Sequence, residues 1–115
     1  MIKRADELRR DTVEGLMGGE GVVNRIHLLE VEDFHGKGRL YARHILEPGH
    51  SIGFHVHKGE QEAYFILKGE GLYSDNGEEV TVKAGDFCLC RSGEGHSIKN
   101  TGDENLEFIG LIMNV

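Results

Sequence analysis

Three histidines and one glutamate are the residues of this chain whose types and spacing could do chemistry. His55 and His57 are separated by one residue, Glu62 follows shortly after them, and His96 comes from a later segment. If the segment around Val56 is a strand, its two histidines point to the same face, because side chains alternate with period two. Imidazoles and a carboxylate together form an N₃O ligand set, which suits a divalent transition metal better than magnesium or calcium. The spacing therefore predicts a metal site.

The segments that must position these residues have the composition of short strands joined by turns. The chain has 115 residues, of which 17 are glycine and one is proline. Asn76-Gly77 is typical of a type I′ hairpin turn, which requires positive φ angles. The sequence predicts roughly nine or ten strands in one all-β domain, arranged as a closed barrel or a two-sheet jelly roll. The expected strands cover residues 22–31, 39–47, 51–57, 62–68, 72–74, 79–83, 87–90, 97–100 and 106–113.

Strand parity brings the candidate ligands to one side of the expected sheets. Glu62 shares a face of its strand with Tyr64, and the histidine pair shares a face of the preceding strand. A loop at residues 91–95 is expected to deliver His96. Residues 2–9 are predicted to form a short helix or arm. The glycine-rich residues 15–21 are predicted to form a loop, which could be ordered against a partner subunit.

Charge and composition exclude several classes of partner. With 20 acidic and 13 basic residues the net charge is -7, and no run of Lys or Arg forms the basic patch that nucleic-acid binding needs. No apolar run approaches the roughly 20 residues that span a membrane. The N-terminus has no hydrophobic signal segment, so a cytoplasmic location is expected. The only cysteines, Cys88 and Cys90, are interpreted as reduced, buried thiols, with proximity of one thiol to the metal as the alternative.

The two histidine-bearing segments match two motifs of a known family. The first motif is glycine, five residues, His-x-His, three or four residues, glutamate, six residues and glycine. The second is glycine, five residues, Pro-x-Gly, two residues, histidine, three residues and asparagine. Arg91 stands at the proline position of the second motif, a change that affects the loop and not the ligand set. On these motifs the chain resembles the cupins, through Gly49, His55, His57, Glu62 and Gly69, and then Gly85, Gly93, His96 and Asn100.

This resemblance implies a fold, a ligand set and an assembly. The fold is a single cupin domain over residues 1–115, a double-stranded β-helix or jelly-roll barrel, with motifs at 49–69 and 85–100 and an N-terminal arm at about 1–21. One metal ion, which in this family is manganese, iron, nickel, cobalt, copper or zinc, is implied inside the barrel. The resemblance also implies a homodimer, with residues 2–28 and the C-terminus as candidate contact regions. The implied metal ligands are His55, His57, Glu62 and His96.

Other residues are candidates for the cavity. Tyr64 and Glu60 are the candidate catalytic residues. The alternative for the tyrosine is a core aromatic. For the glutamate the alternatives are a hydrogen-bond partner of a ligand histidine, a substitute carboxylate ligand, or a solvated loop acid. Arg43 and His44 point to opposite faces of one strand, so one of them could meet an anionic substrate. Gly53 shares a face with the histidine pair and would leave room above the metal.

Two functions from different classes are consistent with this site. The leading hypothesis is a metalloenzyme of the dioxygenase, decarboxylase or isomerase type, acting on a small polar or anionic molecule. Its metal would act as a Lewis acid or bind dioxygen. The alternative is a non-catalytic sensor module that binds a small ligand or a metal. Turnover, or a separate DNA-binding partner, would discriminate between them.

Overall fold

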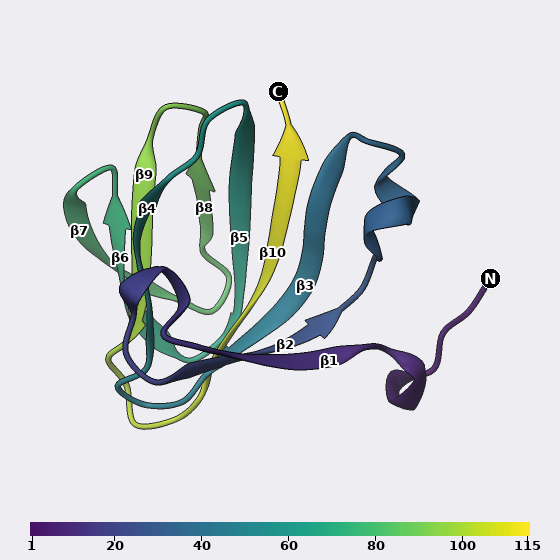
Figure 1. Ribbon diagram of the computed structural model, residues 1–115. Coiled ribbons are helices and arrows are strands. Elements are labelled where there is room, and N and C mark those ends of the chain that lie inside the picture. The colour runs from purple at the N-terminus through teal and green to yellow at the C-terminus, as the bar shows by residue number, and fades with distance from the viewer.

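The computed structural model covers residues 1–115 and contains ten strands in two antiparallel sheets that face each other (Figure 1). One sheet has six strands in the order β1-β2-β3-β10-β5-β8, and the other has four in the order β4-β9-β6-β7. The predicted all-β, two-sheet architecture is confirmed. The strands are β1 (Arg10–Glu14), β2 (Val22–His27), β3 (Gly38–Leu46), β4 (Ser51–Val56), β5 (Glu60–Lys68), β6 (Glu70–Asp75), β7 (Glu78–Lys83), β8 (Phe87–Cys90), β9 (Gly95–Asn100) and β10 (Leu106–Asn114).

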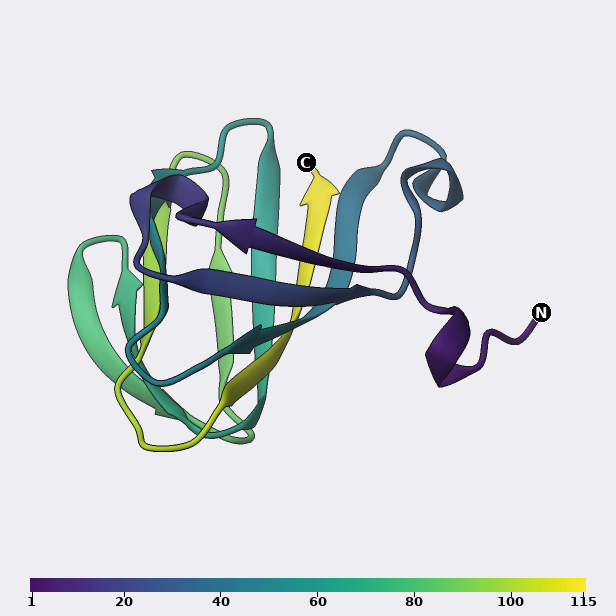
Figure 2. The same cartoon turned by 60° about the horizontal axis from the view of Figure 1, so that its bottom comes forward.

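The helical content is limited to three short 3₁₀ turns, η1 (Ala5–Glu7), η2 (Leu16–Gly18) and η3 (Val31–Phe34). None of them has the length and apolar character that a membrane-crossing helix needs. After β1, the chain carries η2 from the six-stranded sheet across to β4 (Figure 2). Residues 15–21, predicted to be a loop that could contact a partner subunit, are therefore ordered against the same chain.

Several predicted boundaries were wrong. Residues 10–14 of the expected arm form a strand that pairs with β2, and the strand expected over 22–31 ends at His27. β1 escaped detection because Val13 is its one apolar residue and supplies almost no alternating pattern. Glu60 begins β5 rather than lying in the preceding loop, and β9 begins at Gly95 rather than Ser97, so His96 lies on the strand that follows the loop. Both differences bring site residues onto regular strands.

The space between the sheets is filled by apolar side chains whose positions follow strand parity. Val13 and Leu16 pack against this core from the N-terminal segment, although both remain partly exposed. Asn76 and Gly77, with φ angles of 51° and 99°, form the predicted hairpin turn between β6 and β7. The buried core consists of Val23, Leu46, Ile52, Tyr64, Ile66, Tyr73, Val82, Cys88, Ile98, Leu106 and Phe108.

The two cysteines on β8 are both buried and unpaired, as the sequence predicted. Burial raises the pKa of each thiol to about 11, so both remain protonated near neutral pH. The Cys90 thiol donates a hydrogen bond to the carbonyl oxygen of Glu94 at 3.4 Å. Neither cysteine is part of the histidine and glutamate cluster described below.

Candidate metal centre

The two sheets bring the four candidate ligands together between them. His55 lies on β4, His57 directly follows that strand, Glu62 lies on β5 and His96 lies on β9. One ligand atom from each residue lies within 4.8 Å of every other. The His96 Nε2 atom is 3.1 Å from that of His55, 3.2 Å from that of His57 and 3.0 Å from Glu62 Oε1. The spacing in the sequence thus corresponds to one compact cluster.

The second ring nitrogen of each histidine is held by a separate group. His55 Nδ1 lies 2.7 Å from the carbonyl oxygen of Gly53. His57 Nδ1 lies 3.1 Å from Glu60 Oε1, and His96 Nδ1 lies 2.9 Å from the Tyr73 hydroxyl. Such contacts set the ring orientation and the tautomer of a metal-ligating histidine. The chain therefore supplies an outer partner for all three rings.

These partners determine which nitrogen carries the proton. A backbone carbonyl and a carboxylate can only accept hydrogen bonds, so His55 and His57 carry their protons on Nδ1. Their Nε2 lone pairs then converge with an acceptor oxygen of Glu62, at 3.8 Å from His55 and 3.2 Å from His57. Converging lone pairs repel one another unless a cation lies between them. The donor set and its tautomers therefore fit a divalent transition metal ion, which this cluster could hold.

The charge state of the cluster favours the same interpretation. Burial raises the pKa of the Glu62 carboxyl, but the three histidines around it outweigh this effect and hold the pKa well below its usual range. The neighbouring Glu62 carboxylate raises the pKa of His57, whereas burial lowers the pKa of His96. Glu62, although only 4% exposed, is therefore ionised at neutral pH.

Glu60 is tied into an ion pair behind the cluster. Its carboxylate accepts hydrogen bonds from Arg39 Nε and Nη2 at 2.9 and 2.7 Å, and its Oε1 also faces His57. The hydrogen bond from Arg39 lowers the pKa of Glu60 to about 2. This residue is neither a solvated loop acid nor one of the residues that line the cavity. It is instead a hydrogen-bond partner of His57, one of the candidate ligands.

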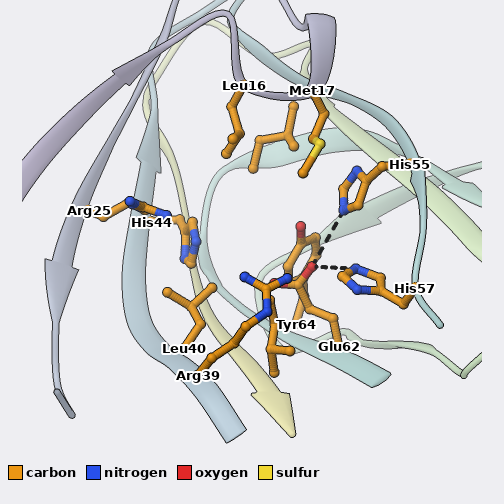
Figure 3. Close-up of a pocket in the computed structure, with 12 residues that line it drawn as sticks. Leu16, Met17, Arg25, Arg39, Leu40, His44, His55, His57, Glu62 and Tyr64 are labelled. Atoms are coloured by element: carbon orange, nitrogen blue, oxygen red, sulfur yellow. Dashed lines mark hydrogen bonds and ion pairs between the residues drawn. The ribbon is translucent and has the colours of Figure 1, made fainter. Parts of the chain in front are cut away.

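A cavity of about 60 Å³ lies beside the cluster, between the sheets (Figure 3). Tyr64, a predicted candidate, lines this cavity while its ring stacks on His96 at 5.0 Å between centroids. Burial raises the pKa of Tyr64 well above its usual value, so its hydroxyl stays protonated. The lining residues are Leu16, Met17, Arg25, Arg39, Leu40, His44, Ile52, His55, His57, Glu62, Tyr64 and Ile112.

The structure shows which of Arg43 and His44 faces the cavity. His44 lines the cavity, while Arg43 points away from it and pairs with Glu107. Burial lowers the pKa of His44 to about 4, so this ring is neutral near pH 7. Two guanidinium groups also reach the cavity lining, those of Arg25 and Arg39. The lining therefore contains fixed cations as well as neutral donors.

The expectation that Gly53 leaves room above the metal was wrong. A Cβ atom at Gly53 would lie 1.9 Å from the carbonyl oxygen of Met17, so the backbone of η2 occupies this space. Leu16 and Met17 project from η2 toward the cavity (Figure 3). A glycine at this position permits close approach of two backbone segments rather than an empty volume.

The loop before β9 uses the backbone N–H of Arg91, which a proline at this position would lack. The Arg91 backbone N–H donates a hydrogen bond to Glu94 Oε1 at 2.9 Å, and the Glu94 N–H donates to the Arg91 carbonyl at 3.0 Å. The Gly93 N–H donates to the His57 carbonyl at 2.7 Å. The departure from the motif proline is therefore offset by side-chain capping, and the loop remains attached to the segment that carries a ligand histidine.

Sequence reasoning missed several residues of this site. Tyr73 lies on a strand that was predicted, but its contact with His96 depends on the pairing of β6 with β9. Arg25 and Arg39 reach the cavity from strands whose register the sequence left open. Met17 lies in a glycine-rich segment that gave no periodic signal. Only the pairing of distant segments, which no local pattern encodes, could have identified them.

Comparisons with known proteins agree with the motifs. A family model described as "Cupin domain" matches residues 42–112. An "Oxalate-binding protein" from Thermotoga maritima is 49% identical over 113 residues, which cover 98% of this chain and 93% of the relative. A crystal structure of a predicted oxalate decarboxylase from the same organism has a TM-score of 0.94 at 48% identity, with both chains covered completely. A protein with a double-stranded β-helix domain from Klebsiella pneumoniae has a TM-score of 0.72 at 26% identity, covering 98% of this chain and 89% of its own.

Proposed function

This chain belongs to the cupin family, and we propose that it binds one divalent transition metal ion through His55, His57, Glu62 and His96 and holds a small carboxylate anion beside it. The observation that carries the proposal is the set of outer contacts that direct Nε2 of the ligand histidines toward Glu62. When bound, the metal would supply Lewis-acid or redox chemistry. The identity of the ion stays open among manganese, iron, nickel, cobalt, copper and zinc.

The size and charge of the cavity support a small anionic ligand. At about 60 Å³ the cavity holds about four to six water-sized groups. Arg25, Arg39 and the Tyr64 hydroxyl are the donors of its lining that could meet carboxylate oxygens. The Thermotoga maritima relative is named for binding oxalate, and oxalate is a short dicarboxylate of this kind.

For the enzyme form of the proposal, the residues of the chain would bind and orient the anion. Tyr64 would donate a hydrogen bond to it, while Glu60 would orient His57 rather than transfer protons, because its carboxylate is engaged by Arg39. The cavity lining includes no carboxylate except Glu62. This absence of a second acid favours the non-catalytic binding module as the second candidate, since no other carboxyl group is placed to protonate a product.

The first test is elemental analysis of the purified protein beside a His55→Ala/His57→Ala variant. Near-stoichiometric metal in the natural chain and its loss in the variant are expected. Calorimetric titration of the metal-loaded protein with oxalate should then give saturable binding, which the variant lacks. If reconstitution with each candidate metal leaves no bound ion, the proposal fails. Carbon dioxide release or oxygen uptake with bound oxalate would distinguish the enzyme from the binding module.

We propose in addition that two copies of the chain pair through the outer face of the larger sheet. Phe65 and Phe87 are paired across β5 and β8 and are 47% and 63% exposed, and Ile109 lies beside Phe65 on β10. These apolar side chains of β5, β8 and β10 lie next to one another, and such contiguous patches mark interaction surfaces. The charges of Arg43 and Glu107 on this face cancel in an ion pair, so two copies of an acidic chain can meet there. Sedimentation should show a dimer that Phe65→Arg disrupts and that Val80→Arg, on the other sheet, leaves intact.

A further inference from the structure

The feature that the proposed function leaves unexplained is the position of η2 over the cavity. Leu16 and Met17 line the cavity on the side away from Glu62 (Figure 3). Leu16 also packs against the buried core, whereas Met17 is 52% exposed and keeps its side chain at the rim. We call these two residues the roof. They are the only part of the N-terminal segment that lines the cavity.

The backbone of the roof is held in an uncommon conformation. Met17 has φ and ψ angles of 54° and 32°, in the left-handed region that residues with side chains rarely adopt. Such conformations persist only where the surrounding structure imposes them, and they concentrate at ligand sites. The contacts that impose this conformation are hydrogen bonds at both ends of the segment. Gly15 N–H donates to the Gly21 carbonyl at 2.9 Å, and Ser51 and Glu20 exchange hydrogen bonds at 2.9 and 2.8 Å.

Two glycines let the roof lie directly on β4. A Cβ atom at Gly19 would lie 2.2 Å from the Ser51 carbonyl oxygen, and one at Gly53 would lie 1.9 Å from the Met17 carbonyl oxygen. The segments therefore approach each other backbone to backbone, two residues before His55. Contact of this kind leaves no freedom for the roof to rise without breaking several hydrogen bonds. The roof is a rigid wall of the cavity rather than a mobile loop.

We infer that Leu16 and Met17 set the length of carboxylate ligand that the pocket accepts, an inference that rests on the proposed binding of a small carboxylate anion. A ligand anchored at the cluster extends toward the roof, which lines a cavity of about 60 Å³ with room for about four to six water-sized groups. A two-carbon diacid fits within this space. Each added methylene group of a longer diacid meets apolar side chains that project from a fixed backbone. The roof thus favours short diacids by excluding longer ones.

The test compares three diacids on manganese-loaded protein by calorimetric titration: oxalate, malonate and succinate. Met17→Gly removes the roof side chain and suits the positive φ, so the variant should fold at least as well as the natural chain. The expected result is that the preference for oxalate over succinate falls at least about fivefold, the factor that corresponds to about 1 kcal/mol of relieved crowding. Leu16→Ala should reduce the same preference independently.

His35→Gly is the matched control, because His35 has a φ of 50°, is exposed and lies outside the cavity lining. It relieves the same backbone strain and should leave the preference unchanged. If the natural chain binds oxalate but the ratio of oxalate to succinate affinity in both roof variants stays within twofold of the control, the roof inference is wrong and the proposed function stands. If the metal-loaded natural chain binds none of the three diacids, the proposed function itself fails. Metal content of each variant, measured beside the titration, confirms that the cluster is intact.

Discussion

Replacement of Glu60 by glutamine should weaken metal binding although Glu60 touches no metal. Its carboxylate accepts a hydrogen bond from His57 Nδ1 at 3.1 Å and so holds the ring with Nε2 toward the cluster. A hydrogen bond to a charged group contributes about 1.5–3 kcal/mol and a neutral one about 0.5–1.5 kcal/mol. Glutamine keeps the neutral bond, so the loss is about 1–1.5 kcal/mol, or roughly a tenfold weaker metal affinity. Glu60→Ala removes the whole contact and should approach a hundredfold.

Either substitution of Glu60 also removes the carboxylate that pairs with Arg39. The positive charge of this guanidinium, beside the cavity, would then repel a metal cation and weaken metal binding further. The assay is competition with a chelator for manganese and for zinc, with thermal unfolding to confirm the fold. Glu78→Gln removes an equal charge from an exposed position on β7 and is the control. An affinity for Glu60→Gln within threefold of this control would refute the view that Glu60 orients His57.

Three further outcomes are expected. Tyr73→Phe removes the hydroxyl that lies 2.9 Å from His96 Nδ1 and should lower metal affinity about tenfold in the same chelator assay. The hydrogen bond from Arg25 holds the pKa of Asp11 far below its ordinary 3.8, so the carboxylate stabilises the fold above about pH 4 and this contribution is lost as the pH falls through the lowered pKa. Asp11→Asn should therefore lower the melting temperature at pH 7 by roughly 4 °C, and by less at pH 3. Gly53→Ala should reduce metal affinity and the preference for oxalate together, measured in parallel titrations.

The cluster of candidate metal ligands could be predicted from the sequence because its information is local. His55 and His57 need only strand parity to share a face, and their motif adds Glu62 at a set spacing. The contact between Tyr73 and His96 depends instead on the register of β6 against β9, which is determined by the packing of both sheets. The same holds for Arg39, whose role emerges only when β3 is placed beside the start of β5. Local pattern therefore identifies the residues of the cluster but not the residues that orient their side chains.

Gly53 contacts both a histidine of the cluster and the roof, so it links these two parts of the site. Its carbonyl oxygen accepts the hydrogen bond of His55 Nδ1 at 2.7 Å, and its bare Cα accommodates the Met17 carbonyl. The peptide that orients a metal ligand is thus the one against which the roof rests. Any side chain at this position must displace the roof or shift the carbonyl, and a shift of the carbonyl rotates His55 away from the cluster. We therefore expect metal affinity and the length of the accepted carboxylate to be coupled through Gly53, which would not follow if Gly53 only left empty space.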